Sequence, residues 1–332
     1  MFQNYLVTGA TGFLGRAVTQ ALLREGKRVR ALVLEGDPLE KALPESVEVV
    51  RGDVCTMSAL APLFSGAGGE TCVIHCAGIV SVASRPDARM WTVNVVGTRN
   101  VLRHCESAGV RRMIYVSSVH AIPGSPEGAS VMDPGTCSLP AVRGHYAESK
   151  AEATYLVTQA ARRGLDAVVV FPSCVVGPGD IGKGSFTSML ISYLSGRLPF
   201  AVRGGYDFTD VRDVAAGIVA CAERGRVGKG YVLSGRYASI GELLALADAA
   251  AGTGRRPLLL PLWLAKAAAP FYERRCLKAG KPAFFTPYAM SVLGSRCRYG
   301  SEDAARDFGY SSRPLSSTVR DTVTWLKQNM GL

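Results

Sequence analysis

The sequence lacks several features that mark specialised classes of protein. Its 332 residues contain no block of like charge, because the formal net charge of +11 comes from Lys and Arg spread along the chain, with only short pairs such as Arg111-Arg112 and Arg274-Arg275. No aromatic-interleaved basic patch and no zinc-ligand spacing accompanies these charges, so nucleic-acid binding is not predicted. We expect the positive charge to aid solubility and to attract anionic cofactor phosphates.

Paired cysteines and long apolar runs are also absent. The nine cysteines are odd in number and dispersed, with no C-x-x-C pair, which favours reduced thiols in a cytoplasmic protein over a disulfide framework. The first predicted strand follows Met1 within a few residues, so no secretory leader is predicted. The most apolar stretch, Leu258 to Tyr272, is interrupted by Pro261, Lys266 and Pro270 and is shorter than the roughly 20 residues of a spanning helix, but it is compatible with contact at a membrane surface.

What the sequence does contain is a large hydrophobic fraction, 48%, arranged in alternating short β-rich runs and helical stretches. This alternation is typical of βαβ units and predicts an α/β fold with a doubly wound parallel sheet, the Rossmann architecture. The predicted strands are Asn4–Thr8, Val29–Leu34, Val47–Arg51, Thr71–His75, Arg112–Ser117 and Asp166–Phe171. The predicted helices include Gly12–Glu25, Thr92–Ala108 and Tyr146–Arg163.

The pattern changes after Gly177, where Pro178-Gly179-Asp180 and two further glycines form a loop rich in helix and strand breakers. We therefore predict a dinucleotide-binding domain over residues 1–176, to which residues 206–235 return. A smaller substrate-binding lobe is predicted over residues 177–205 and 236–332.

A glycine-rich turn joins the first strand to the first helix. Gly9 suits the tight turn, Gly12 lets backbone N–H groups approach a pyrophosphate, and Gly15 allows close packing of the helix on the strand. The N-terminus of the helix then presents free N–H groups and its positive dipole end to the anion. This arrangement at the beginning of the chain predicts a dinucleotide site.

The spacing of these glycines, G-x-x-G-x-x-G, resembles the extended branch of the short-chain dehydrogenase/reductase family, also called the NAD-dependent epimerase/dehydratase superfamily. The resemblance continues in order along the chain, through Gly52-Asp53-Val54, His75-Cys76-Ala77-Gly78, Asn94-Val95-Val96-Gly97-Thr98, Tyr115-Val116-Ser117-Ser118, Tyr146-Ala147-Glu148-Ser149-Lys150 and Phe171-Pro172-Ser173-Cys174-Val175. It implies a cofactor site formed by Gly9, Thr11, Gly12, Phe13, Leu14, Gly15, Glu35, Asp53, Val54, Cys76, Ala77, Gly78, Asn94, Ser117, Tyr146, Lys150, Pro172 and Val175. For Asn94, a structural kink or hydrogen-bond role and a part in proton relay both stay open.

Tyr146 and Lys150 are four residues apart in a predicted helix, so both side chains project from one face. A nearby ammonium favours the phenolate, and the family resemblance implies that the positive nicotinamide of the oxidised cofactor does so too. We therefore expect the pKa of Tyr146 to be lowered from its usual value near 10. The family resemblance implies that Tyr146 moves a proton during hydride transfer, that Lys150 holds the nicotinamide ribose, and that Ser118 bonds the substrate oxygen.

The end of the second predicted strand bears on the choice of nicotinamide. Leu34 stands where relatives that prefer NADP often have Arg, and the acidic Glu35 follows it, which favours NAD. Arg28 and Arg30 lie close by in the sequence, so NADP is not excluded.

Two enzymatic substrates and one non-enzymatic function are compatible with these motifs. The favoured one is a secondary alcohol or ketone on an apolar ring, as in the dihydroflavonol reductase and 3β-hydroxysteroid dehydrogenase branch, because the second lobe is rich in apolar and aromatic residues such as Phe186, Phe200 and Phe208. The second is epimerisation of a nucleotide sugar, with Lys183, Arg197 and Arg203 as candidates to meet a diphosphate, although solvated surface charge is the simpler interpretation of these three. A dinucleotide-binding regulator is the third.

The remaining polar residues receive simpler interpretations. The four histidines, His75, His104, His120 and His145, lack metal-ligand spacing, so no metal is predicted, and His120 is a candidate to line the substrate cleft. Cys174 is expected to be a buried, inert thiol. The family resemblance also makes a homodimer the default.

Overall fold

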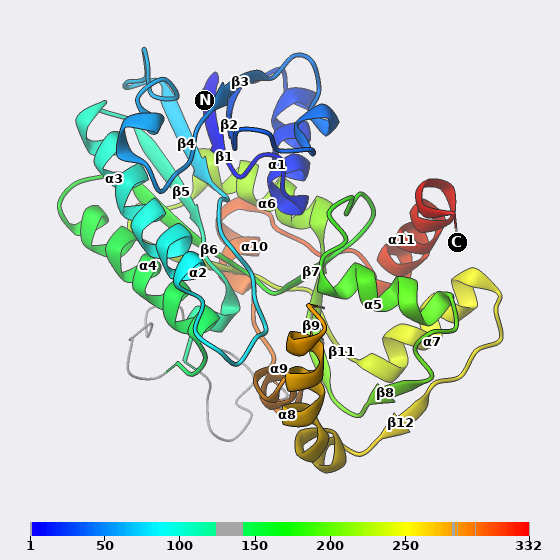
Figure 1. The fold of residues 1–332 in the computed structure, drawn as a ribbon. Coiled ribbons are helices and arrows are strands. Elements are labelled where there is room, and N and C mark those ends of the chain that lie inside the picture. The colour runs from blue at the N-terminus through cyan, green and yellow to red at the C-terminus, as the bar shows by residue number, and fades with distance from the viewer. Residues whose placement is uncertain (1, 124–141, 281–282, 284, 296, 332) are drawn as a thin grey trace.

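The seven-stranded sheet of the computed structural model confirms the predicted α/β class (Figure 1). The structure describes residues 2–123, 142–280, 283, 285–295 and 297–331. The strands of the sheet are β1 (Asn4–Thr8), β2 (Arg28–Val33), β3 (Glu48–Arg51), β4 (Thr71–His75), β5 (Arg112–Val116), β6 (Ala167–Pro172) and β10 (Gly230–Leu233). The six predicted strands all occur, with ends that differ by at most one residue.

The strand order β10-β6-β5-β4-β1-β2-β3 is that of a doubly wound sheet in which all neighbours pair in parallel. The order reverses between β1 and β4, and their carboxyl ends diverge to form the crevice in which ligands of such sheets bind. Because Thr8 pairs with His75 at these ends, the glycine turn after β1 lies beside the turn after β4.

Helices cover both faces of the sheet. On one face α1 (Phe13–Arg24) packs against α6 (Val211–Arg224), with α10 (Glu302–Phe308) beyond it, while α3 (Thr98–Ser107) and α4 (His145–Arg162) cover the other face (Figure 1). The predicted helix over Thr92–Ala108 is interrupted, because residues Thr92–Gly97 form a π-helical segment between α2 (Ala88–Trp91) and α3.

A second lobe has its own hydrophobic core and lies beyond the carboxyl ends of the main strands (Figure 1). Its strands are β7 (Cys174–Val176), β8 (Phe200–Val202), β9 (Gly205–Asp210), β11 (Arg236–Ser239) and β12 (Leu258–Leu260). Its helices are α5 (Ser185–Leu194), α7 (Ile240–Ala251), α8 (Leu262–Lys278), α9 (Pro287–Gly294) and α11 (Leu315–Met330). Among the described residues, no helix combines the length and apolar character needed to cross a membrane.

The chain passes between the two lobes more than once. Strand β9 belongs to the small sheet β11-β9-β7, whereas α6 and β10, which follow it, join the large sheet and its helical layer. Helix α10 then packs against α6 and β10 before α11 ends the chain in the second lobe. The two lobes are therefore interleaved in sequence, and residues from both meet at the carboxyl edge of the large sheet.

Candidate active site

The glycine turn after β1 requires glycine for two physical reasons. Gly9 has φ +69°, and a Cβ on Gly9 would lie 2.6 Å from the backbone nitrogen of Ala77. A Cβ on Gly15 would lie 2.0 Å from the carbonyl oxygen of Gly9, so α1 approaches the turn more closely than any side chain permits. The sequence interpretation of these two glycines agrees with this geometry.

The N-terminus of α1 has free hydrogen-bond donors. Arg16 is the first residue whose N–H bonds back into the helix, to the carbonyl of Gly12, so the N–H groups of Phe13, Leu14 and Gly15 have no intrahelical acceptor. Gly12 supplies no side-chain cap, and the first turn contains no carboxylate. Unpaired donors at a positive dipole end, with no competing acid, fit the pyrophosphate of a dinucleotide.

An acidic residue other than Glu35 contacts this turn. The hydroxyl of Thr11 donates to Oδ2 of Asp37 at 2.7 Å, and Oδ1 of Asp37 accepts the N–H of Leu39 at 2.9 Å. Glu35 and Leu34 are exposed beyond the end of β2. Sequence reasoning missed Asp37 because its place relative to the turn depends on how the loop after β2 folds back.

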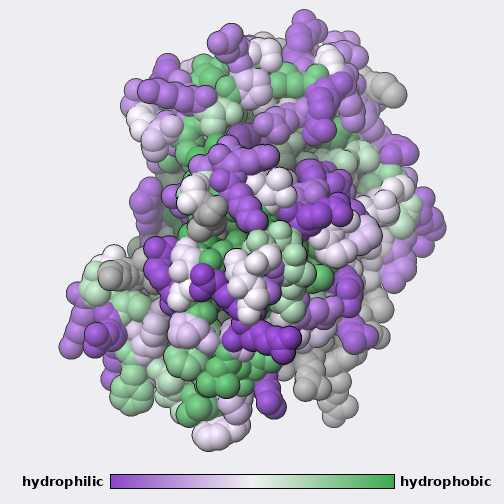
Figure 2. All heavy atoms as spheres, turned by 90° about the vertical axis from the view of Figure 1, so that its right-hand side faces the viewer, coloured by the Kyte–Doolittle hydropathy of each residue, from purple (hydrophilic) through white to green (hydrophobic). Residues whose placement is uncertain are grey.

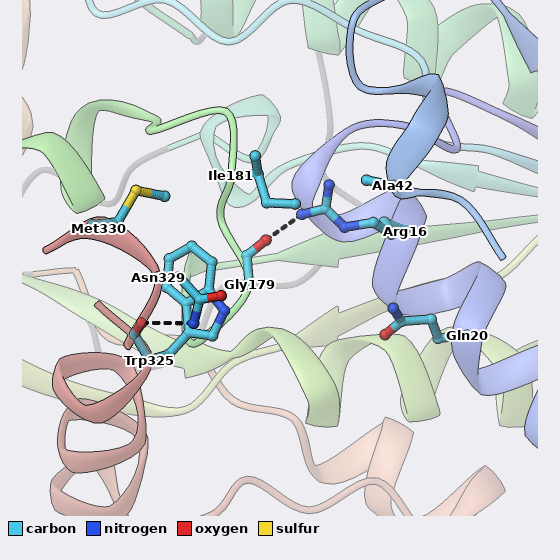
Figure 3. Close-up of a pocket in the computed structure, with 8 residues that line it drawn as sticks. All are labelled: Arg16, Gln20, Ala42, Gly179, Ile181, Trp325, Asn329 and Met330. Atoms are coloured by element: carbon cyan, nitrogen blue, oxygen red, sulfur yellow. Dashed lines mark hydrogen bonds between the residues drawn. The ribbon is translucent and has the colours of Figure 1, made fainter. Parts of the chain in front are cut away.

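Arg16 links the glycine turn to the second lobe and was also missed. Its side chain is buried and donates to the carbonyl oxygens of Thr11 and Gly179, and burial lowers the pKa of its guanidinium while Asp180 acts in the opposite direction. It borders a hollow of about 360 Å³ between α1, the loop after β7 and α11 (Figure 3). The hollow is lined by Arg16, Gln20, Ala42, Gly179, Ile181, Trp325, Asn329 and Met330. Because none of the catalytic candidates lines it, this hollow is distinct from the reaction site.

A buried hydrogen-bond chain fixes the turn after β4. His75 joins Thr8 Oγ1 at 2.6 Å through Nδ1 and Thr98 Oγ1 at 3.0 Å through Nε2. Since Thr98 donates its hydroxyl to the carbonyl of Asn94 at 2.6 Å, it accepts from His75 Nε2–H, and Nδ1 then accepts from Thr8. Burial lowers the pKa of His75 to about 3, so this histidine is neutral and structural, as the sequence interpretation favoured.

Asn94 anchors the loop that follows β4. Its side-chain oxygen accepts the N–H of Ile79 at 2.8 Å, and its amide donates to the carbonyl of Ile79 and to Ser149 Oγ, both at 3.0 Å. It lies in the π-helical segment, where the regular helical hydrogen-bond register is shifted. These contacts support a structural, hydrogen-bonding role for Asn94. Its part in proton relay stays a prediction.

The other residues expected to hold the cofactor lie along the carboxyl edge of the sheet. Asp53 caps its own turn by accepting the N–H of Cys55, and the carbonyl of Val54 accepts from Asn100. The remaining members of the set lie as follows: Cys76, Ala77 and Gly78 in the turn after β4, Pro172 at the end of β6, and Val175 in β7. Ser117 has its hydroxyl bonded to Thr154 of α4 at 2.7 Å.

Tyr146 and Lys150 occupy the first turns of α4, and both are buried. Burial raises the pKa of Tyr146 to about 12, and hydrogen bonding with Ser118 opposes this rise. The expected lowering by Lys150 is therefore wrong for the protein alone, because the desolvation of a buried phenolate is the larger effect. Tyr146 is a neutral phenol near pH 7, which suits it to donate a proton to a carbonyl oxygen.

Lys150 retains donor capacity after its contacts within the protein. Its ammonium donates to the carbonyl of Val116 at 2.8 Å and lies 3.5 Å from the hydroxyl of Tyr115. A Cβ on Gly78 would be 3.3 Å from Lys150 Nζ, so the turn after β4 packs directly against this ammonium. Burial lowers the pKa of Lys150 to about 8. A protonated amine with a free N–H at this position fits the ribose hydroxyls of a nicotinamide nucleotide.

A tyrosine from the second lobe completes the group around Tyr146. The ring of His120 lies edge-on to Tyr146, with centroids 5.6 Å apart, and its Nδ1 is 2.8 Å from the hydroxyl of Tyr288 in α9. A Cβ on Gly144, just before α4, would lie 2.2 Å from the ring of Tyr288. Tyr288 thus packs between the segment after Ser118 and the start of α4. The sequence could not reveal this contact, which spans 168 residues.

A small cavity of about 30 Å³ beside Tyr146 marks the candidate substrate site. It is lined by Val119, His120, Cys174, Gly205, Tyr206, Asp207, Val292, Ser295, Cys297 and Tyr299. His120 lines it as the sequence suggested, and burial lowers the pKa of this histidine to about 4, so its imidazole is neutral. Cys174 is partly buried, not fully buried as predicted, and desolvation raises the pKa of its thiol to about 12, which favours the protonated form. No metal-binding group of His, Cys, Asp and Glu exists within the described ranges.

The fold and these groups define a dinucleotide-binding α/β protein with a Ser-Tyr-Lys set at the carboxyl edge of its sheet. The sequence profile described as "NAD dependent epimerase/dehydratase family" matches residues 5–234. The chain belongs to this family, as an extended short-chain dehydrogenase/reductase, and its members and relatives are NAD(P)-dependent enzymes.

Individual relatives extend over nearly the whole chain. "Sterol demethylase protein B" of Methylococcus capsulatus is 30% identical over 97% of this chain and 98% of its own length. Human "3 beta-hydroxysteroid dehydrogenase type 7" is 30% identical over 98% of this chain and 96% of its own. The crystal structure of gox2253 superposes with a TM-score of 0.85 at 31% identity, covering 98% of both chains.

Proposed function

We propose that this protein is an NAD(P)-dependent oxidoreductase that interconverts a secondary alcohol and a ketone on an apolar ring substrate of hydroxysteroid or flavanonol type. The observation that carries the proposal is the lining of the pocket beside Tyr146. Its described lining residues include no Lys or Arg, and they include Asp207, a buried carboxyl whose pKa is raised by burial. Such a lining disfavours a diphosphate and suits an apolar molecule with a few hydrogen-bonding groups.

The positions of the basic residues weaken the alternative substrate. Lys183, Arg197 and Arg203, the candidates to meet the diphosphate of a nucleotide sugar, are all exposed and do not line this pocket. Of the aromatic residues expected to favour an apolar ring, Phe208 is in the core of the second lobe and Phe200 is exposed. The apolar wall comes instead from residues on other elements, namely Val119, Tyr206, Val292 and Tyr299.

The protein's own groups suggest the following roles. Ser118 and Tyr146 hold the substrate oxygen between two hydroxyls, and Tyr146 transfers its phenolic proton to that oxygen during reduction and accepts it back during oxidation. Lys150 orients the cofactor ribose and stabilises the phenolate. The bound nicotinamide supplies hydride chemistry at the carbinol carbon.

His120 adds a second hydrogen-bonding group at the same pocket. Burial raises the pKa of Tyr288, so its hydroxyl keeps its proton, and we assign this O–H as the hydrogen-bond donor to His120 Nδ1. The neutral imidazole then carries its proton on Nε2 and serves as a donor for a further polar group of the substrate. We include His120 as a specificity residue and Tyr288 as the residue that positions it.

We also propose that the protein prefers NAD and that the first lobe binds the cofactor while the second binds the substrate. Asp37 adds a carboxylate beside the glycine turn through its bond to Thr11, and an acidic residue there favours the ribose hydroxyls of NAD over the 2′-phosphate of NADP. The lobe containing α5, α7, α8, α9 and α11 is assigned to the substrate because α9 and the segment after it border the pocket.

The deciding experiment follows absorbance of the reduced nicotinamide with NAD or NADP and a panel of hydroxysteroids, flavanonols and nucleotide sugars, for wild type and Tyr146→Phe. Stoichiometric NADH formation from a ring alcohol, lost in the variant, is expected. An isomerised nucleotide sugar without net NADH formation would instead identify an epimerase and overturn the proposal.

A further inference from the structure

An exposed apolar face covers the end of the second lobe that is formed by β8, β12 and α8. Trp263 and Phe271 of α8 are 71% and 73% exposed, and Leu258 of β12 is 61% exposed. Leu258 pairs in register with Phe200 of β8, which is 47% exposed. Figure 2 shows hydrophobic residues gathering at the lower end of the molecule, where Figure 1 places these three elements. Several large apolar side chains at one end mark an interaction surface rather than isolated exposed residues.

The arrangement of α8 explains why these side chains point outward. Trp263, Ala267 and Phe271 are spaced four residues apart, so they share one face of the helix, and all three are exposed. The opposite face presents the small, buried Ala265 and Ala269 toward the rest of the lobe. Packing against the protein therefore uses the small residues of α8, and the large apolar ones have no partner within the described structure.

Basic residues accompany the apolar ones on α8. Arg274, Arg275 and Lys278 are exposed in its last turns and Lys266 is exposed near its beginning, and none of the four makes an ion pair with a described residue. The one acidic residue of the helix, Glu273, is buried and accepts the N–H of Ser84 at 2.8 Å. The outward face of α8 is thus apolar and positively charged.

We propose that this face, defined by Phe200, Leu258, Trp263, Leu264 and Phe271 with the basic residues of α8, docks on the surface of an anionic lipid bilayer. The aromatic and leucine side chains would enter the boundary between headgroups and acyl chains while the Lys and Arg side chains meet the lipid phosphates. A second copy of the chain fits less well, because α8 presents basic residues but no exposed carboxylate that could pair with them across such an interface.

Docking through this face would place the membrane surface close to the substrate pocket. Helix α8 packs against α9, and α9 contains both Tyr288, which bonds His120, and Val292, which lines the substrate pocket. An apolar molecule dissolved in the bilayer would therefore be close to the helix that borders the reaction site. The docking itself does not depend on the identity of the substrate.

The test is flotation of the full-length protein with vesicles of phosphatidylcholine alone or with about one third phosphatidylserine. Wild type is expected to float with the anionic vesicles. The double variant Trp263→Ser/Phe271→Ser should partition at least about tenfold more weakly, since it loses two large apolar side chains. Arg274→Glu/Arg275→Glu should weaken partitioning onto the anionic vesicles by a similar factor. The partitioning of this variant should also no longer depend on salt. Val227→Ser is the matched control, because Val227 is 55% exposed but lies in the first lobe, between α6 and β10. This variant should float as wild type does.

Thermal unfolding and NAD binding of each variant check that the fold is intact, because the substituted side chains are exposed. Three outcomes would overturn the proposal. The first is that wild type stays unbound with both kinds of vesicle. The second is that the Trp263→Ser/Phe271→Ser protein floats as well as wild type. The third is that light scattering shows a wild-type dimer which this double variant converts to monomer, and that result would assign the face to self-association.

Discussion

The two lobes differ in which side chains they leave without a protein partner. Around the large sheet, polar groups are buried and bonded, as in the chain from Thr8 through His75 to Thr98 and in the contacts of Lys150. On α8 of the second lobe, Trp263 and Phe271 are exposed without a described partner. The first lobe thus bears the cost of removing polar groups from water to hold them in one geometry. Helix α8 of the second lobe instead gathers large apolar side chains on one exposed face.

The largest effect is expected from removing the one hydroxyl that is proposed to move a proton. Tyr146→Phe should lower kcat by about 10² to 10⁴, because the ring still fills its buried site but general acid–base catalysis is lost. NAD affinity, measured by fluorescence titration, should fall far less than kcat, because the glycine turn and Lys150 are still in place. A variant that keeps more than a tenth of the wild-type rate would show that another group is the acid.

A backbone clash in the first lobe should come next. Gly15→Ala places a methyl group 2.0 Å from the Gly9 carbonyl, so α1 must move away from the turn, and NAD should bind at least about 100-fold more weakly. Gly68→Ala is the control, since a Cβ at Gly68 meets no atom within 4 Å. Equal NAD affinity in the two variants, by calorimetry, would mean that the turn does not hold the cofactor.

The burial of Lys150 predicts an unusual dependence of stability on pH. Its folded pKa of about 8 lies below its value of 10.5 in an exposed chain, so between these values the unfolded state binds more protons and stability rises with pH. Wild type should gain about 2 kcal/mol from this group between pH 8 and 10.5 that Lys150→Met does not gain. The measurement is urea unfolding at several pH values, with Lys183→Met as the exposed control. If the two variants show the same pH dependence, Lys150 is solvated in solution.

The smallest effect concerns the contact between the lobes. Tyr288→Phe removes one hydrogen bond to His120 and should lower kcat/KM by about three- to tenfold. The loss should depend on the substrate's second polar group, so a substrate lacking that group should be affected less. Tyr155→Phe, at an exposed tyrosine of α4, provides the matched control. A uniform loss for every substrate would indicate a purely structural role for Tyr288.

The parts of the site that are local in sequence were predictable. The glycine turn, the strand before it and the Tyr146–Lys150 pair depend on spacings of three or four residues, which fix relative position through helix and turn geometry alone. The interrupted helix at Asn94 and the contact of Asp37 with Thr11 were not predictable, because each depends on how a neighbouring loop packs.

The pKa of Tyr146 shows the same division in energetic terms. Its proximity to Lys150 in the sequence predicts a stabilised phenolate, but the degree of burial decides the direction of the shift, and burial comes from the whole fold. For the same reason, the number of basic residues said little about the substrate, since the structure leaves Lys183, Arg197 and Arg203 on the surface.

The sequence by itself determined the α/β class, the glycine turn and the order of the family's motifs, because short-range periodicity and spacing encode strands, helices and turns directly. Only the tertiary structure decided that Tyr288 reaches His120, that Arg16 joins the glycine turn to Gly179, and which face of α8 stays exposed. These contacts join residues far apart in the chain, so they follow from the packing of the two lobes and not from any local pattern.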